Sequence, residues 1–289
     1  MKRLIIVYNS RSSKAEAVRR EVIAPARKLG GFLVGKYEVL PTDVDDNARK
    51  LAGILEDDDF VIAAGGDATA SVALNGCMLS GREVTFGVLP FGNFNDTART
   101  LGKMDFSEII EKFSRGQTKD FYPLRVVVDG EDFRYAAGYV SVGMMAESVE
   151  IFNSRKNRKK LRAGKSKVFS YFLLAKWYFS HRKKQYLPDG ATDYFAVNGR
   201  RIGGIMRGGY FCFSRKFLNG RFYLRNVFSL FWFMARAIFS GIPGEEKKED
   251  VLEFDKKTSV TVQIEGESKE FECQEIRVFK DRNLKVVCR

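Results

Sequence analysis

The chain has 289 residues, a hydrophobic fraction of 45% and a formal net charge of +13 at pH 7. This length and this hydrophobic fraction predict one or two domains with a sizeable core. No segment reaches the roughly 18 uncharged apolar residues that a membrane-spanning helix needs. The positive charge favours an anionic partner, which is a nucleotide, a nucleic acid or an acidic membrane surface.

Histidine and cysteine usage argues against two common kinds of site. The single histidine, His181, lies in a basic segment, and one histidine disfavours Ser-His-Asp triads and zinc sites. The four cysteines lack metal-ligand spacing, so we expect reduced thiols in the cytoplasm. The apolar run at the amino terminus is too short for a signal-peptide core, and we interpret it as a first strand.

Apolar runs and amphipathic segments alternate over residues 1–120, which predicts a doubly wound α/β nucleotide-binding domain with a mostly parallel sheet. The expected strands are Leu4–Tyr8, Tyr37–Leu40, Val61–Ala64 and Val84–Leu89. The expected helices are Ser13–Leu29, about Asp45 to Leu55, one between the last two strands, and Phe106–Phe113. Ligands of such sheets lie beyond the carboxyl ends of the strands.

Two polar turns follow the last two of these strands, GGDAT at residues 65–69 and PFGNFND at residues 90–96. Paired glycines let backbone N–H groups approach an anion, and a helix starting at Thr69 would add its positive end. Asp67 would face a metal ion or a hydroxyl rather than a phosphate. An ordinary tight turn is the alternative reading of GGDAT, because strand–helix junctions are rich in glycine.

After residue 120 short strands follow one another, which predicts a mostly antiparallel β-sandwich over residues 121–283. They are Leu124–Asp129, Asp132–Val140, Tyr194–Val197, Arg201–Ile205, Tyr210–Phe213, Arg221–Leu224, Val260–Ile264, Lys269–Phe271, Ile276–Phe279 and Leu284–Val287. Two aromatic helices interrupt them, Lys165–His181 and Arg225–Ser240, and the basic run Arg155–Lys167 precedes the first. These helices are either core helices or a surface for anionic lipid, and the basic run is either lipid-binding or a loop. We expect no nucleic-acid binding, because no recognisable module accompanies the charge.

The two turns together resemble a known family. GGDAT followed by LPFGNFNDTAR is similar to GGDGT followed by LPxGTxNDFAR in the diacylglycerol kinase catalytic-domain family, which includes the bacterial YegS/BmrU-like lipid kinases. The resemblance implies transfer of the γ-phosphoryl group of ATP to a lipid hydroxyl, with Mg²⁺. It also implies that the last strand, residues 284–289, returns to the first domain.

The resemblance assigns candidate site residues. The nucleotide-binding candidates are Asn9, Thr42, Gly65, Gly66, Asp67, Ala68, Thr69, Gly92, Asn93, Asn95 and Asp96. Asp67 belongs to the signature that orients ATP and metal, and Glu267 or Glu265 in QIEGES is the base. A structural Mg²⁺ is implied at Asn219 and the backbone carbonyls of Lys216 and Arg221. The alternatives are a strand-end cap for Thr42, an N-cap for Asp96, a surface hairpin for the glutamates and an Asn-Gly hairpin turn at Asn219.

Several residues depart from the family pattern. Ala68 replaces a glycine and must avoid a positive φ, Ser71 and Val72 replace Asn-Glu, Asn93 replaces a threonine, and Glu265 replaces an aspartate. We therefore keep two alternatives, a catalytically degenerate nucleotide- or lipid-binding relative and an NAD kinase. The expected partners are a lipid substrate and an anionic membrane surface, contacted peripherally at the inner face of the membrane. The choice between a monomer and a homodimer is open.

Overall fold

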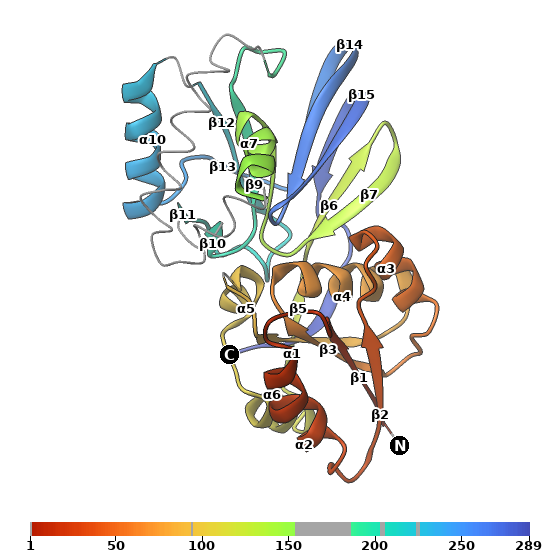
Figure 1. The fold of residues 1–289 in the computed structure, drawn as a ribbon. Helices are drawn as coiled ribbons and strands as arrows, with labels where there is room; N and C mark the ends of the chain where they lie inside the picture. The colour runs from red at the N-terminus through yellow and green to blue at the C-terminus, as the bar shows by residue number, and fades with distance from the viewer. Residues whose placement is uncertain (1, 94, 154–185, 203–205, 224–225) are drawn as a thin grey trace.

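The computed structural model describes residues 2–93, 95–153, 186–202, 206–223 and 226–289 (Figure 1). The predicted helix Lys165–His181, with its histidine, and the basic run Arg155–Lys167 lie outside the described residues. The described chain forms an α/β half and an antiparallel half, one above the other in Figure 1. Within it, no helix is both long enough and apolar enough to cross a bilayer.

The α/β half contains a six-stranded sheet in the order β2-β1-β3-β4-β16-β5. Its strands are β1 (Lys2–Tyr8), β2 (Phe32–Glu38), β3 (Phe60–Gly65), β4 (Thr85–Pro90), β5 (Thr118–Phe121) and β16 (Leu284–Val287). All neighbouring pairs are parallel except β16 and β5. The last strand of the chain therefore lies inside the first sheet, between β4 and β5.

Helices cover both faces of this sheet. Successive strand residues point to opposite sides, so the apolar residues of each strand are buried under helices on both faces. They are α1 (Ala15–Val18), a π-helical turn η1 (Arg19–Ile23), α2 (Ala24–Ala26), α3 (Val44–Ala52), α4 (Asp67–Ser80), α5 (Asp96–Leu101) and α6 (Phe106–Ser114). Val61 and Ala63 of β3 belong to the cluster that includes Leu74 of α4. Phe60 and Ile62 belong to the opposite cluster, with Ile109 of α6.

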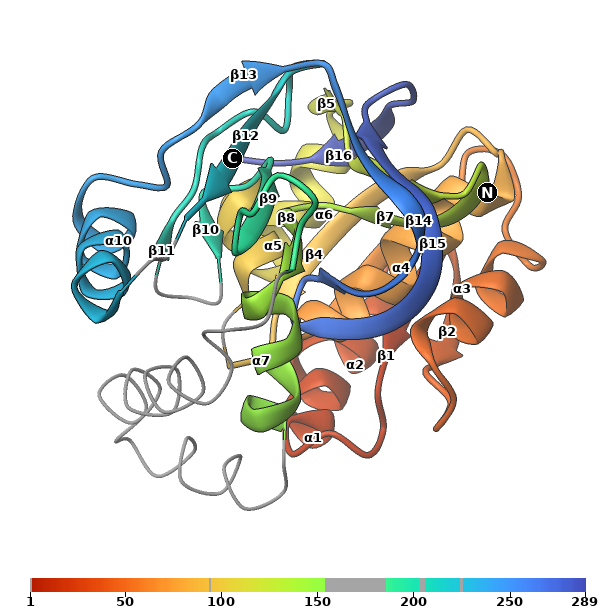
Figure 2. The same cartoon turned by 90° about the horizontal axis from the view of Figure 1, so that it is seen from above.

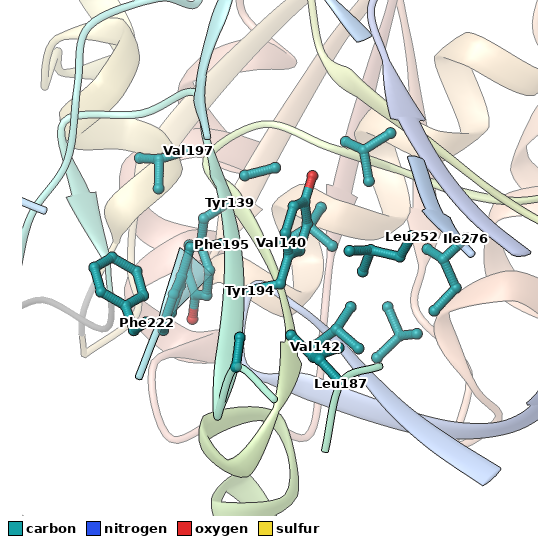
Figure 3. Packing of buried hydrophobic residues seen from close by; sticks show 14 of the residues in the cluster. Tyr139, Val140, Val142, Leu187, Tyr194, Phe195, Val197, Phe222, Leu252 and Ile276 are labelled. Carbon is teal, nitrogen blue, oxygen red and sulfur yellow. The ribbon is translucent and has the colours of Figure 1, made fainter. Parts of the chain in front are cut away.

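The antiparallel half is an eight-stranded sheet in the order β13-β12-β9-β8-β14-β15-β6-β7, with a separate two-stranded ribbon, β10-β11. Its strands are β6 (Leu124–Val128), β7 (Glu131–Ala136), β8 (Tyr139–Gly143), β9 (Asp193–Val197), β10 (Arg201–Ile202), β11 (Met206–Arg207), β12 (Phe217–Phe222), β13 (Glu245–Lys247), β14 (Glu249–Ile264) and β15 (Glu267–Phe279). Figure 2 shows the strong curvature of the β14–β15 hairpin. Figure 3 shows part of the core of the antiparallel half, to which Val140, Tyr194, Phe195 and Ile276 belong.

This architecture confirms the predicted fold class, an α/β half with a mostly parallel sheet and an antiparallel second half. Several details of the strand prediction are wrong. The predicted strand Asp132–Val140 is two strands, β7 and β8, and the predicted strands Lys269–Phe271 and Ile276–Phe279 are one strand, β15. Residues Tyr210–Phe213 form a turn and not a strand. Strand β2 begins at Phe32, five residues before the predicted Tyr37. Its residues are half-buried or exposed, so it lacks the long buried apolar run that marks an inner strand of a parallel sheet.

Among the described residues, two helices accompany the antiparallel sheet, α7 (Met144–Asn153) and α10 (Val227–Phe239). The predicted helix at 225–240 is confirmed as α10, which starts with a capping box between Asn226 and Ser229. It lies at the outer edge of the antiparallel half in Figures 1 and 2.

Candidate active site

Strand register brings the predicted turns to one edge of the first sheet. Tyr8 of β1 pairs with Ala64 of β3, and Gly65 of β3 pairs with Pro90 of β4. Because these strands are parallel, the residues that follow them meet at the same carboxyl edge. Asn9, the GGDAT turn and the PFGNFND turn therefore share this edge, as the sequence predicted.

The GGDAT turn is a direct passage from strand to helix. Gly66 is the N-cap of α4, which begins at Asp67, two residues earlier than the predicted start at Thr69. Ala68 lies in the first turn of α4 and has no positive φ, so the alanine is unstrained. A Cβ added to Gly65 would lie 2.5 Å from Thr69 Oγ1, which shows that the Thr69 side chain covers this glycine.

The two polar turns pack directly on each other through glycine backbones. A Cβ added to Gly92 would lie 2.4 Å from the Cα of Gly66, so no side chain fits between the turns. The Asn95 side chain braces the second turn: it accepts from the Gly92 N–H at 2.7 Å and donates to the Gly92 carbonyl at 2.7 Å. Asn95 adopts a left-handed φ of 55°, whereas the neighbouring Asn93 is exposed. Asn95 therefore shapes the turn, and Asn93 faces solvent.

Two carboxylates lie at this edge, Asp67 at the start of α4 and Asp96 at the start of α5. Asp67 Oδ1 accepts from the backbone N–H of Thr97 at 3.1 Å, which joins the start of α4 to the start of α5. Burial raises the pKa of Asp67, and the backbone N–H groups at the start of α5 oppose this rise. Asp96 pairs with Arg99 at 3.3 Å. The N-cap of α5 is Asn95, so the N-cap alternative for Asp96 is wrong.

Glu265 comes from the antiparallel half and reaches the same place. Its Oε1 accepts from the backbone N–H of Gly138 at 2.7 Å. Burial and the charges of Asp67 and Asp96 raise the pKa of Glu265 to about 8. Its other oxygen, Oε2, is buried without a hydrogen-bond partner among the described residues. The structure thus brings Glu265 together with both carboxylates of the first half.

Backbone strain accompanies this placement. Glu265 and Gly266 form the turn between β14 and β15, with φ values of 51° and 90°. A left-handed φ is uncommon for glutamate. The turn that presents the Glu265 carboxylate therefore uses a conformation that glutamate disfavours, as is frequent at functional sites.

Glu267 lies elsewhere, although it is only two positions along the chain. Its Oε2 accepts from Arg134 Nη1 at 2.8 Å, and Arg134 Nε donates to Asp45 of α3 at 2.8 Å. Burial raises the pKa of Glu267, Arg134 opposes the rise, and Asp45 and Asp43 add to it. This cluster connects the hairpin to α3 and leaves Glu267 facing that helix.

Two candidate nucleotide ligands are engaged in local turns. Thr42 Oγ1 accepts from Asn47 Nδ2 at 2.8 Å, which agrees with the alternative of a strand-end cap. Asn9 Oδ1 accepts from the Arg11 N–H at 3.0 Å. Asn47 also bonds the backbone of Leu40, so it organises the turn between β2 and α3.

The sequence reading missed Tyr139 and Gly138. The Tyr139 hydroxyl accepts from Gln263 Nε2 at 3.1 Å. Burial, with the charges of Asp96, Glu265 and Asp67, raises the pKa of Tyr139 well above its ordinary value. A tyrosine after a glycine in an apolar strand carries no sequence signal, and its position depends on strand pairing.

The residues implied for a structural Mg²⁺ fit that ion poorly, although Asn219 Oδ1 is buried without a hydrogen-bond partner among the described residues. Asn219 and Arg221 lie inside β12, paired with Ala196 and Tyr194 of β9, so the Asn-Gly hairpin alternative is also wrong. The Lys216 carbonyl accepts from the Lys280 ammonium at 2.7 Å, which places a cation on one of the implied ligands. Across the described residues, no group of three or more His, Cys, Asp or Glu side chains is arranged to hold a metal ion.

The carboxyl edge of the first sheet has features that suit the phosphates of a nucleotide. The glycine turns leave backbone open at the amino end of α4, a helix of 14 residues, and such an end favours phosphate. Asp67 and Asp96 supply two carboxylates, and one or two carboxylates with substrate phosphates are the usual setting for Mg²⁺.

Comparison with known proteins agrees with the geometry. The family model described as "Diacylglycerol kinase catalytic domain" matches residues 3–126. This segment belongs to the diacylglycerol kinase catalytic-domain family. The resemblance predicted from GGDAT and LPFGNFNDTAR is thereby confirmed.

Relatives within this family are similar over part of their length. A diacylglycerol kinase of Bacillus subtilis is 34% identical over 104 residues, covering 35% of this chain and 34% of that protein. A mitochondrial acylglycerol kinase of Xenopus laevis is 31% identical over 93 residues, covering 30% of this chain and 21% of that protein. The matches thus span 34% and 21% of the length of these two curated relatives. A crystal structure of a diacylglycerol kinase from Bacillus anthracis has a TM-score of 0.66 over 100% of this chain and 96% of its own, at 16% identity, which shows a shared fold.

Proposed function

We propose that this protein is an ATP-dependent lipid kinase that phosphorylates the hydroxyl of a diacylglycerol-like lipid. The observation that supports it most is the position of Glu265 beside Asp67 and Asp96, at the edge where the glycine turns meet. When bound, ATP would supply the γ-phosphoryl group and Mg²⁺ would neutralise its developing charge.

The chain's own residues divide the work. Backbone N–H groups of residues 66–69, at the amino end of α4, bind phosphate oxygens. Asp67 and Asp96 would hold the divalent ion. Glu265 takes the proton of the lipid hydroxyl as its oxygen bonds to the γ-phosphorus, and the bond from that phosphorus to the ADP oxygen breaks. A base with a pKa of about 8 is well matched to neutral or mildly alkaline pH.

The acceptor reaches the site from a membrane surface. Four aromatic side chains of α10 face solvent, with exposures of 84% for Phe228, 58% for Phe231, 73% for Trp232 and 73% for Phe239. Its other face, which includes Leu230, Phe233 and Ala237, packs in the core. A surface helix normally turns a polar face outward, so this helix fits peripheral contact with lipid at the inner face of the membrane.

A degenerate binding protein is the second candidate. Val72 occupies the position of the family's glutamate and is buried with 1% exposure, so this turn of α4 offers no carboxylate there. Such a protein would bind nucleotide or lipid without transfer.

One assay separates these candidates. Purified protein is incubated with γ-labelled ATP, Mg²⁺ and a panel of membrane lipids in mixed micelles, beside the isosteric variant Glu265→Gln. We expect label in a lipid that has a free hydroxyl, and strong loss in the variant. ATP binding without transfer to any lipid would favour the degenerate protein, and NADP formation from NAD would favour an NAD kinase.

A further inference from the structure

Lys280 occupies a cage of oxygen atoms at the point where the chain leaves β15. It follows β15 directly, and its side chain is buried, with 6% exposure. Its Nζ donates to the carbonyls of Phe211, Ser214 and Lys216 at 2.8, 2.9 and 2.7 Å. A fourth acceptor, Asn198 Oδ1, lies at 2.5 Å.

The chemistry of this cage is that of a cation site. Backbone carbonyls and an amide oxygen are typical ligands of hard metal ions, and here they converge on an ammonium. Within the described chain, Lys280 has no carboxylate at ion-pair distance, so the oxygens of the cage are its main compensation. Burial lowers the pKa of Lys280 to about 7. The four acceptors oppose this, because the ammonium has three N–H bonds and the neutral amine has two.

We propose that the Lys280 ammonium is a built-in cation that replaces a structural divalent metal ion in this protein. The Lys216 carbonyl would be a ligand of such an ion, and it is already bonded to Lys280. The implied side-chain ligand, Asn219, has an amide where a carboxylate would be needed to balance a divalent charge. A second cation beside the ammonium would be repelled.

The cage also connects to the candidate active site. The Asn198 side chain donates to the carbonyls of Tyr122 and Ala137 at 3.0 and 2.9 Å. The Asn198 N–H donates to the Gly138 carbonyl at 2.7 Å, and the Gly138 N–H holds Glu265. Hydrogen bonds therefore run from Lys280 through Asn198 and Gly138 to Glu265.

The first test needs no variant and no kinase assay. The wild-type protein is dialysed against EDTA, its metal content is measured by mass spectrometry, and thermal unfolding is followed at mildly acidic pH with and without added Mg²⁺ or Ca²⁺. We expect the same unfolding temperature in every arm. A fall in EDTA that either ion reverses would show a structural metal and overturn the proposal.

The second test removes the cation. Lys280→Ala is compared with Lys285→Ala, an exposed lysine that pairs with Asp120 at 2.7 Å on the surface. Because buried carbonyls lose their donor, we expect Lys280→Ala to unfold about 5–10 °C lower and Lys285→Ala about 2 °C lower or less. Equal unfolding temperatures for the two variants would contradict the proposal.

Chemical rescue distinguishes a lost cation from lost packing. Ammonium or ethylammonium ions should raise the unfolding temperature of Lys280→Ala, whereas tetramethylammonium, which cannot donate hydrogen bonds, should not. None of the three ions should raise the unfolding temperature of the wild type or of Lys285→Ala. Absence of rescue in a folded Lys280→Ala would sink the cation role. If Lys280→Ala does not fold, the charge-preserving variant Lys280→Arg takes its place, and we expect it to fold. Failure of Lys280→Arg to fold, together with metal-dependent stability of the wild type, would refute the proposal.

Discussion

The backbone N–H of Gly138 donates to Glu265 Oε1 at 2.7 Å, across 127 positions of the chain. Gly138 lies between β7 and β8, and Glu265 turns the β14–β15 hairpin. This hydrogen bond directs the carboxylate of the antiparallel half towards Asp67 and Asp96 of the α/β half. It is the contact on which the proposed base depends.

The two glutamates of the hairpin should differ in activity assays. Glu265→Gln keeps the acceptor for Gly138 but cannot take a proton, so we expect phosphate transfer to fall about 100-fold or more. Glu267→Gln weakens the contact with Arg134 and should cost less than about 10-fold, because its partner is Arg134 and not the crevice. Initial rates of transfer from labelled ATP to lipid measure both. A larger loss in Glu267→Gln would assign the base to Glu267 instead.

Glu265 should also make stability depend on pH. Its ordinary pKa of 4.5 is raised to about 8 in the folded protein, so between these values the folded state holds a proton that the unfolded state has lost. Stability from this group is therefore full below pH 4.5 and lost as pH rises through about 8, with a slope of up to about 1.4 kcal/mol per pH unit.

Urea unfolding from pH 5 to pH 8.5 checks this pH dependence. The variant Glu265→Gln, which cannot ionise, should show a flatter profile than wild type over this range. An identical slope in the variant would count against the raised pKa.

The contact between the glycine turns should tolerate no methyl group. Gly92→Ala places a Cβ 2.4 Å from the Gly66 Cα, so the turns must separate. We expect a loss of about 1–3 kcal/mol in stability and at least about 10-fold weaker ATP binding, since the phosphate-binding backbone shifts. Calorimetric ATP titration and thermal unfolding measure these effects.

A matched control for this substitution is Gly30→Ala. Nothing lies within 4 Å of a Cβ at Gly30, and its φ is not positive. We expect its ATP affinity and stability to equal those of wild type. Equal ATP affinity in Gly92→Ala would exclude the two turns as the nucleotide site.

The exposed aromatic residues of α10 should control vesicle binding. The double variant Phe228→Ser, Trp232→Ser removes two large side chains that are 84% and 73% exposed and make few core contacts. We expect at least about 10-fold weaker co-sedimentation with vesicles of anionic lipid and an unchanged unfolding temperature. Leu33→Ser, at an exposed leucine of the other half, is the control and should bind as wild type does. Full binding by the double variant would remove α10 as the docking element.

The amino-acid sequence by itself determined the fold class and the location of the two glycine turns. Continuous apolar runs such as Val61–Ala64 and Val84–Leu89 encode buried parallel strands, and the glycine motifs follow them directly. These signals are local, because strand burial and turn geometry depend on neighbouring residues. The amphipathic spacing of α6 and the aromatic run of α10 are local signals in the same way.

Only the tertiary structure decided which side chains meet. The spacing of Glu265 and Glu267 cannot tell which one reaches the crevice, since a hairpin turn directs them to Gly138 and Arg134 on different strands. Tyr139 and Lys280 carry no motif, and their roles arise from antiparallel pairing and from the return of the chain into the first sheet. Burial and charge at these residues depend on contacts between distant segments, which no local pattern records.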